Sequence, residues 1–343
     1  MDLSWRSYVS LTKPRVVVLL QITALCAVLV HDRLYEHLST DTANTMLIVF
    51  VGGYLSAGGA NAINMWYDRD IDPFMTRTEK RAIPSGEVSA ESALALGVLL
   101  SIAGVTWFWV LSNEVAAFWS AFSILFYVFV YSIWLKRSTP QNIVIGGIAG
   151  STPPVIGWAA AEDSLAVSME STTQIMESLV DMGSPLPWLM FLLIFLWTPP
   201  HFWALALYRS EEYGRVDVPM MPNVKGAERT LFEMKVYAIV LILMSLAVPS
   251  SFGGLEESDT LYHLLGWSVV GLSIWYASSV WRIDLTEERD ETGRMPTAAR
   301  SFFVSMLYLA LMFVVLVAAS FGVNGAVLGA GISLFAIIRS ETR

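Results

Sequence analysis

The sequence is poor in charged side chains. They make up 15% of the 343 residues, whereas a soluble domain carries about 25%. Hydrophobic residues make up 55%. Apolar runs of roughly 20 residues recur along the chain, which is the length of a helix that crosses the hydrocarbon core of a bilayer. The composition therefore excludes a soluble domain and predicts an all-α polytopic membrane protein.

Cysteine and positive charge are also scarce. Cys26 is the only cysteine, so a disulfide within the chain and a cysteine-rich metal site are excluded. The net charge of −9 argues against nucleic acid as a partner. No cleavable signal or Arg-rich, acid-poor presequence is evident. Because only a short lead precedes the first apolar run, we expect the cytoplasmic membrane of a prokaryote rather than an organelle.

Nine membrane spans are expected from the apolar runs: Val16–Val30, Met46–Met65, Ala90–Leu111, Val115–Leu135, Ile143–Ala161, Trp188–Tyr208, Tyr237–Phe252, Leu264–Ile283 and Phe302–Ala319. A further stretch, Val323–Ile338, is either a tenth span or a tail against the bundle. With a cytoplasmic N-terminus, the outer loops hold only Arg33 among the basic residues. The positive-inside rule therefore predicts that orientation, and it favours the tenth span, which returns Arg339 and Arg343 to the inside.

Three polar residues at the end of the second run carry the strongest chemical signal. Asn64, Asp68 and Asp72 stand four residues apart, a spacing that stacks them on one face of a helix. The helix dipole opposes carboxylates at this end, so they need a positive partner, and Mg²⁺ carrying a diphosphate is the natural candidate. Asp70 is expected to face elsewhere or to pair with a neighbouring base.

Basic residues follow this motif and recur after the fourth expected span. Arg77, Lys80 and Arg81 are placed to neutralise phosphate charge. A solvated loop of mixed charge is the alternative. Lys136 and Arg137 end the fourth span, where an ordinary positive-inside anchor is the favoured interpretation.

Double prolines interrupt two expected spans, at Pro153-Pro154 and Pro199-Pro200. The freed backbone groups need a cavity or neighbouring helices, and a pair of such spans points to a binding site within the bundle. His201 is an ionisable group at membrane depth, which makes it a candidate functional residue. Its alternative is a neutral core histidine bonded to a carbonyl that the prolines free. Glu211 and Glu212 are either a second metal site or plain loop acids.

The spacing of Asn64, Asp68 and Asp72 resembles the first aspartate motif of the UbiA-type intramembrane prenyltransferases. Over about residues 8–310, the chain is most similar to the branch that farnesylates haem. The stretches that carry this similarity are Leu11–Arg15, Tyr67–Asp72, Arg77–Thr78, Pro84–Gly86, Leu135–Gly147, Pro153–Pro154, Gly157–Trp158, Pro199–Ala206, Tyr208–Arg209, Tyr213, Pro219–Pro222 and Lys225–Gly226.

The resemblance implies a nine-helix transmembrane bundle with a central cavity and a cytoplasmic cap made from the two long inner loops. We expect one membrane domain over residues 1–320 and an apolar extension over 321–343. The implied reaction is Mg²⁺-dependent transfer of a farnesyl group from farnesyl diphosphate to a vinyl group of protoheme IX (haem b), which gives haem O and diphosphate. A haem A synthase or an oxidase-assembly protein is the implied candidate for a protein partner.

The resemblance also assigns roles to individual residues. The implied catalytic residues are Asn64, Asp68, Asp72 and Lys136. The implied Mg²⁺ ligands are Asp68 and Asp72, with Glu211 and Glu212 as further candidates. The implied diphosphate contacts are Arg77, Arg81, Lys136 and Arg137. The implied haem region includes His201 and Arg209.

Two other functions compete with this interpretation. One is a UbiA-type enzyme with another acceptor, such as a quinone precursor or a glyceryl phosphate, and the stretch Pro199–Trp203 argues against it. The other is a secondary transporter, which broken helices and intramembrane ionisable groups also suit. A transporter normally places its charged site near the midplane. Here the acids cluster at one membrane face beside many bases, as a phosphate headgroup requires.

Overall fold

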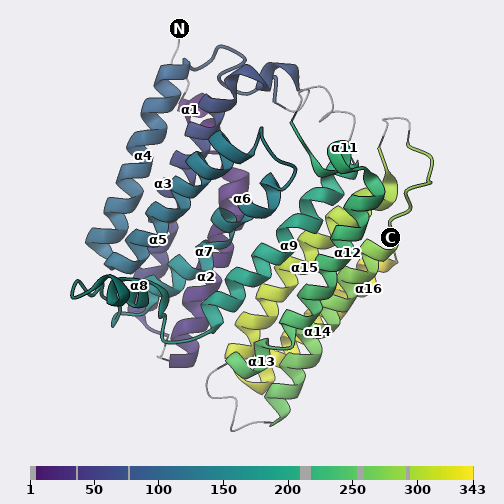
Figure 1. The fold of residues 1–343 in the computed structure, drawn as a ribbon. Helices are drawn as coiled ribbons and strands as arrows, with labels where there is room; N and C mark the ends of the chain where they lie inside the picture. The colour runs from purple at the N-terminus through teal and green to yellow at the C-terminus, as the bar shows by residue number, and fades with distance from the viewer. Residues whose placement is uncertain are drawn as a thin grey trace. The chain divides into compact units, whose positions relative to one another are not determined.

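The computed structural model describes residues 5–35, 38–75, 78–208, 218–252, 259–290 and 294–342. All regular structure within these ranges is helical, as predicted (Figure 1). The chain forms two compact units. The first consists of the described residues within 1–28, 39–182 and 211–220, and the second of those within 29–38, 183–210 and 221–343.

The helices of the first unit are α1 (Trp5–Leu11), most of α2 (Pro14–Tyr35), α3 (Thr40–Tyr67), α4 (Ala90–Leu111), α5 (Glu114–Leu125), α6 (Asn142–Ser151), α7 (Pro153–Ala161) and α8 (Thr172–Val180). Two 3₁₀ turns, η1 (Asp68–Asp70) and η2 (Asp72–Phe74), follow α3, and a π-helix, η3 (Phe126–Leu135), continues α5. α3 and α4 approach closely at Gly59, where an added Cβ would lie 2.6 Å from the backbone nitrogen of Ser101. Small residues thus allow backbone-to-backbone packing along α3.

The helices of the second unit are α9 (Leu186–Tyr208), α11 (Met221–Lys225), α12 (Ala227–Ser245), α13 (Val248–Ser251), α14 (Asp259–Trp281), α15 (Pro296–Ser320) and α16 (Val323–Glu341). α12 packs against α9 and α14, and α16 packs against α14 and α15. The Glu341 carboxylate accepts hydrogen bonds from Trp275 Nε1, Arg282 Nη1 and Arg300 Nη2 at 3.0, 2.6 and 2.9 Å. These bonds fix the end of α16 to its two neighbours.

Nine helices in the described part of the chain are long and apolar enough to cross a membrane. They match eight of the nine expected spans and, in addition, the C-terminal stretch, which forms α16. The expected span Tyr237–Phe252 is not among them. The chain there is divided into α12 and α13, and the first half of α12 carries four charges, at Glu228, Arg229, Glu233 and Lys235. The prediction of a polytopic membrane protein is confirmed, and α16 joins the helices that are long and apolar enough to span.

The two double prolines have different effects on their helices. Pro153 and Pro154 begin α7 and separate it from α6 at Thr152, whose Oγ1 donates to the carbonyl of Ala149 at 2.8 Å. Pro199 and Pro200 lie inside α9, which continues through them. The first pair therefore divides its span into two helices, whereas the second pair leaves one helix with two missing backbone donors.

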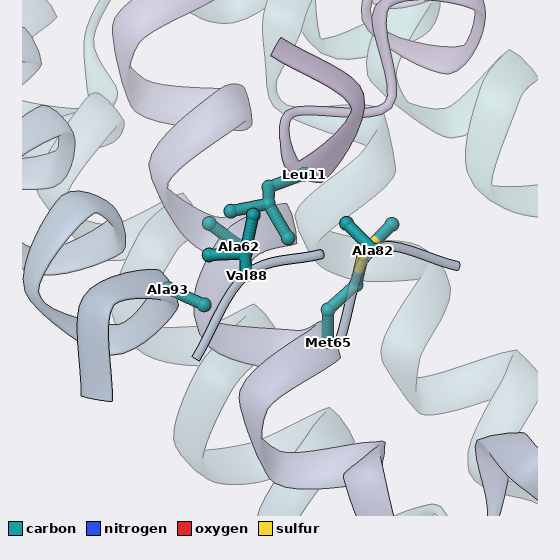
Figure 2. Close-up of a cluster of buried hydrophobic side chains, with 6 residues drawn as sticks. All are labelled: Leu11, Ala62, Met65, Ala82, Val88 and Ala93. Carbon is teal, nitrogen blue, oxygen red and sulfur yellow. The ribbon is translucent and has the colours of Figure 1, made fainter. Parts of the chain in front are cut away.

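A buried hydrophobic cluster holds the loop that follows α3. Its members come from α1, α3, α4 and this loop, and they are Leu11, Ala62, Met65, Ala82, Val88 and Ala93 (Figure 2). The N–H of Val88 donates to the carbonyl of Ala82 at 3.0 Å, which closes the loop on itself. Arg81 directly precedes Ala82, so the apolar cluster also fixes the backbone position from which the Arg81 side chain extends.

Candidate functional site

The acidic motif lies where α3 ends. The N–H of Asp68 donates to the carbonyl of Asn64 and caps the helix after Tyr67, and Asp72 begins the second 3₁₀ turn. The expectation of one helical face through Asp72 is therefore wrong beyond Tyr67, because the backbone tightens there. Asp68 and Asp72 are still directed inward, with 1% and 2% of their surface exposed. Buried carboxylates require positive partners.

Lys136 is the partner of Asp68. Its Nζ forms a short ion pair with Asp68 Oδ2, and Arg137 Nη2 lies 3.8 Å from Asp68 Oδ1. Asp68 Oδ1 itself is buried and has no hydrogen-bond partner in the described structure. The structure thus brings both bases to the acidic motif, where the resemblance placed them, whereas the residue pattern alone favoured a simple membrane anchor.

A π-helix sets the position of Lys136. The backbone N–H of Lys136 donates to the carbonyl of Tyr131, five residues earlier, at 2.8 Å. One turn earlier in η3, Ser132 Oγ accepts a hydrogen bond from Asn64 Nδ2 at 3.1 Å. The pairs Asn64–Ser132 and Asp68–Lys136 are therefore adjacent contacts between α3 and the π-helical segment. π-helical turns are rare and are frequently found at functional sites.

Arg81 is the partner of Asp72. Its Nη1 donates to both carboxylate oxygens, at 2.9 and 2.7 Å. Thr78 Oγ1 donates to the backbone carbonyl of Asp72 at 2.7 Å and ties the loop to η2. Of the other two predicted bases, Lys80 is exposed, and Arg77 lies outside the described residues. The ion pair to the second acid thus comes from Arg81.

Asp70 turns away from the two buried acids, and the expectation that it pairs with a base is confirmed. Its oxygens accept hydrogen bonds from Arg137 Nη1 and Nη2 at 2.7 Å each, and its side chain is exposed. The Arg137 guanidinium also lies 4.8 Å from the centroid of the Tyr67 ring. The hydrogen bond to Asp70 raises the pKa of Arg137, so this base stays charged at the rim of the site.

Lys13 joins the site although sequence reasoning did not assign it there. It links α1 to α2 with φ 50°, a left-handed conformation uncommon outside glycine. Asn61 Nδ2 donates to the Thr12 carbonyl at 3.2 Å and holds this turn on α3. Lys13 Nζ then donates to Asn64 Oδ1 at 2.9 Å. The sequence signal that could have indicated this role is the position of Lys13, directly before the proline that begins the first span.

The cations of the site differ in how their charge is balanced. Lys136 and Arg81 pair with Asp68 and Asp72, whereas Lys13 donates to a neutral amide. Loss of hydration, and then the charges of Arg81 and Lys136, lower the pKa of Lys13 to about 7. Loss of hydration also lowers the pKa of Lys136. Three cations thus surround two buried carboxylates, which favours the binding of an anion.

The acid pair fits a magnesium ion that shares its coordination with a phosphate. No group of three His, Cys, Asp or Glu side chains that could hold a metal is found among the described residues. Mg²⁺ needs fewer protein ligands, because it keeps waters and binds one or two carboxylates together with substrate phosphates. Asp68 and Asp72 supply two carboxylates, and Asp68 Oδ1, which accepts no hydrogen bond, is an oxygen that a bound cation would satisfy. Glu211 and Glu212 lie outside the described residues.

The second unit holds His201 among aromatic rings. The imidazole stacks on Trp197 and on Phe302, with centroids 4.1 and 4.6 Å away. Its Nδ1 lies 2.5 Å from Ser305 Oγ. The alternative of a histidine bonded to a carbonyl that the prolines free is therefore wrong for Nδ1, since its partner is a hydroxyl group. Arg209, the other residue of the expected haem region, lies outside the described residues.

The apolar helices and the acid–base site define a multi-pass helical membrane protein with buried carboxylates and bases gathered at one site. The family model described as the UbiA prenyltransferase family matches residues 20–295. The chain belongs to this family, and it is a prenyltransferase.

Curated relatives align with most of the chain. The protoheme IX farnesyltransferase of Bartonella bacilliformis is 40% identical over 309 residues, which cover 90% of this chain and 89% of that protein. The protoheme IX farnesyltransferase of Afipia carboxidovorans is 43% identical over 312 residues, which cover 90% of this chain and 88% of that protein. The similarity therefore extends well beyond the aspartate motif.

Solved structures show the same fold at lower sequence identity. A digeranylgeranylglyceryl phosphate synthase superposes with a TM-score of 0.66 at 15% identity, and the match covers 93% of this chain and 99% of that one. A UbiA homolog from Archaeoglobus fulgidus bound to GPP and Mg²⁺ superposes with a TM-score of 0.59 at 15% identity, over 92% and 99% of the two chains. At this identity the likeness establishes the fold alone.

Proposed function

We propose that the chain acts as a protoheme IX farnesyltransferase. In this reaction C1 of the farnesyl group forms a bond to a vinyl carbon of protoheme IX, and its bond to the diphosphate oxygen breaks. Water supplies the hydroxyl group of haem O, and diphosphate leaves. The support is the 40% identity to relatives of this name over 90% of the chain and one observation of the site: the buried carboxylate oxygen Asp68 Oδ1 accepts no hydrogen bond and has cations around it.

Asp68 and Asp72 are the residues that would hold Mg²⁺ in this function. When bound, the ion supplies Lewis-acid stabilisation of the charge that develops on the departing diphosphate. Asn64 holds Lys13 at the site, because its side chain accepts from Lys13 Nζ and donates to Ser132 Oγ on the π-helix. The further candidate ligands, Glu211 and Glu212, remain part of this proposal.

The basic residues bind the phosphate oxygens. Lys136 and Arg81 neutralise carboxylates in the structure, and their side chains keep 18% and 17% of their surface exposed. A cation on the carboxylates frees the N–H groups of both bases for phosphate. Arg137 adds charge at the rim, and Arg77 remains part of this proposal as a diphosphate contact. Donors that are fixed before the reaction stabilise developing charge without reorganisation, which is usually the largest catalytic contribution.

The bilayer and the apolar helices provide the rest of the environment. A farnesyl chain and a porphyrin both partition into apolar surroundings, where little water competes for an allylic cation. The distribution of lysine and arginine supports a cytoplasmic N-terminus in the cell membrane, with the acid–base site at the inner face. A haem A synthase or an oxidase-assembly protein is the corresponding recipient of the product.

The test is a reconstituted reaction with purified protein in lipid vesicles. Haem b and farnesyl diphosphate are supplied with and without Mg²⁺, and the haems are separated by chromatography. Haem O should form only when both substrates and the ion are present. Absence of haem O under complete conditions, together with prenylation of a quinone precursor or a glyceryl phosphate, would contradict the proposed acceptor.

A further inference from the structure

His201 is fixed in one orientation by its neighbours. The ring lies between Trp197, one turn earlier on α9, and Phe302 on α15. Phe202 meets it edge-on, with centroids 5.0 Å apart. Only 7% of the residue surface is exposed. Stacked and edge-on aromatic contacts on several sides leave the imidazole little freedom to rotate.

Ser305 determines which ring nitrogen carries the proton. The Ser305 hydroxyl has one proton, and it is directed to the carbonyl of Phe302 at 2.6 Å. Oγ must then accept from His201 Nδ1, 2.5 Å away. Trp197 Nε1 donates to the backbone carbonyl of Ser305 at 2.8 Å and holds the serine in place. The neutral imidazole therefore carries its proton on Nδ1 and a lone pair on Nε2.

The Nε2 atom is available to a ligand. It forms no hydrogen bond with any residue in the described ranges, and it is not one of the fully buried polar atoms that lack a partner. It therefore keeps some accessible surface, although the residue as a whole is buried. A neutral imidazole whose other nitrogen donates to a fixed acceptor is the usual form of a metal-ligating histidine.

The surroundings restrict the kind of metal centre. No second His, Cys, Asp or Glu joins His201 in a three-residue cluster within the described structure, so a free ion would lack ligands here. A metal that already has four donors needs only an axial ligand, as haem iron does. Trp197 and Phe302 lie nearly parallel to the imidazole, at 19° and 23°, so a ligand on Nε2 would meet their apolar edges. These edges suit an apolar ligand better than a hydrated ion.

We propose that His201 Nε2 is an axial ligand to the iron of the substrate haem, and that Ser305 is a positioning residue that holds His201 in the required tautomer. This inference rests on the proposed function, because haem is the acceptor in that reaction. Iron ligation anchors the porphyrin while a vinyl carbon at its periphery reacts. The bond from Nδ1 to Ser305 raises the basicity of Nε2 toward the metal.

The experiment is a spectroscopic titration of the purified full-length protein with haem b in detergent. Wild-type protein should give the absorption and magnetic circular dichroism spectra of a histidine-ligated haem. His201→Ala should lose that signature, and free imidazole should restore it in His201→Gly. Ser305→Ala should bind haem about tenfold more weakly, in the range typical for loss of an outer-shell partner, and Ser305→Thr should recover the affinity.

Matched controls separate ligation from general damage. His263 is exposed in the same unit, and Ser301 is a buried serine one turn before Ser305. His263→Ala and Ser301→Ala should keep the wild-type haem spectrum. If His201→Ala does not fold, His201→Cys replaces it, because a thiolate ligand changes the spectrum in a recognisable way.

The outcomes distinguish this inference from the proposed function. An unchanged haem spectrum in folded His201→Ala or His201→Cys would overturn the axial-ligand role, whether or not haem O still forms. A wild-type protein that neither binds haem nor produces haem O would overturn the proposed function instead. Equal loss of affinity in Ser305→Ala and Ser301→Ala would remove the tautomer role from Ser305.

Discussion

The acidic site of the first unit and the His201 stack of the second unit hold polar groups in opposite ways. In the acidic site, each buried carboxylate meets a cation, Lys136 for Asp68 and Arg81 for Asp72. In the stack, a single imidazole lies between apolar rings and has one hydrogen bond, to a serine hydroxyl. The acidic site holds its polar groups by ion pairing, whereas the His201 stack holds its imidazole by aromatic packing and one hydrogen bond that fixes the tautomer.

This difference determines which kind of ligand each region can bind. Paired charges can be redistributed to a bound cation and a bound phosphate, so ligand binding need not leave a buried charge uncompensated. An imidazole among aromatic rings has no charge to redistribute and offers one lone pair. The two regions should therefore respond independently when either is altered, and the following variants test that independence.

The largest expected effect comes from Asp68→Asn. The substitution removes the negative charge next to the unpartnered oxygen, and it should lower kcat for haem O formation by about 100-fold to 1000-fold, the range for loss of one main electrostatic group. The haem spectrum should stay unchanged. Asp70→Asn is the matched control, because Asp70 is exposed and its side-chain partner is the rim base Arg137. Near-normal turnover by Asp68→Asn would refute the metal role.

Removal of Lys136 tests the ion pair between Lys136 and Asp68. Lys136→Met leaves Asp68 buried without its main cation, which should lower the free energy of unfolding by about 2 kcal/mol, less than for a fully buried pair because Lys136 is partly exposed. The double variant with Asp68→Asn should regain most of that stability but not the activity. Thermal unfolding in detergent measures both. A double variant as unstable as Lys136→Met would contradict the pairing.

Lys13 gives the charged region a pH dependence that the His201 stack lacks. Its lowered pKa, about 7, means that the free site releases a proton as pH rises through that value. Diphosphate binding above pH 7 must then take up one proton, so the affinity relative to Lys13→Arg should fall by up to about tenfold per pH unit. Calorimetry in two buffers of different ionisation enthalpy measures the uptake. Equal uptake in Lys13→Arg and wild-type protein would contradict this assignment.

Ser132→Ala should have the smallest effect of the series. It removes the acceptor for Asn64 Nδ2, and one such hydrogen bond contributes about 1 kcal/mol. KM for farnesyl diphosphate should rise about fivefold, with kcat little changed. Ser138→Ala, which alters an exposed serine three residues beyond the π-helix, serves as the control. A loss of kcat in Ser132→Ala as large as that in Asp68→Asn would show that Asn64 contributes to the chemical step and not only to the position of its neighbours.

Features set by local pattern could be predicted from the sequence. Apolar runs of bilayer length gave the helical membrane class, and the spacing of Asn64, Asp68 and Asp72 located the acidic site. The bounds of the expected span Tyr237–Phe252 differ from those of the helices, because hydropathy alone does not register the start of α12 at Ala227 or the division before α13. The stretch that forms α16 was correctly named as a candidate.

Features set by tertiary contacts could not be predicted. Lys13 reaches Asn64 only because a left-handed turn between α1 and α2 lies against α3. The residue pattern alone favours a membrane anchor for Lys136, and only the resemblance places it in the site, because no sequence pattern predicts the π-helix that turns it toward Asp68. Ser305 lies 104 residues from His201, and nothing in its local sequence indicates that it fixes the imidazole.

The most direct test is a calorimetric titration of purified protein with farnesyl diphosphate, with and without Mg²⁺. Wild-type protein should bind the diphosphate tightly only when the ion is present, and Asp68→Asn should lose that dependence together with most of the affinity. Equally strong binding without Mg²⁺, or an Asp68→Asn variant that binds like the wild type, would contradict the central claim that these buried carboxylates hold a metal-bound diphosphate.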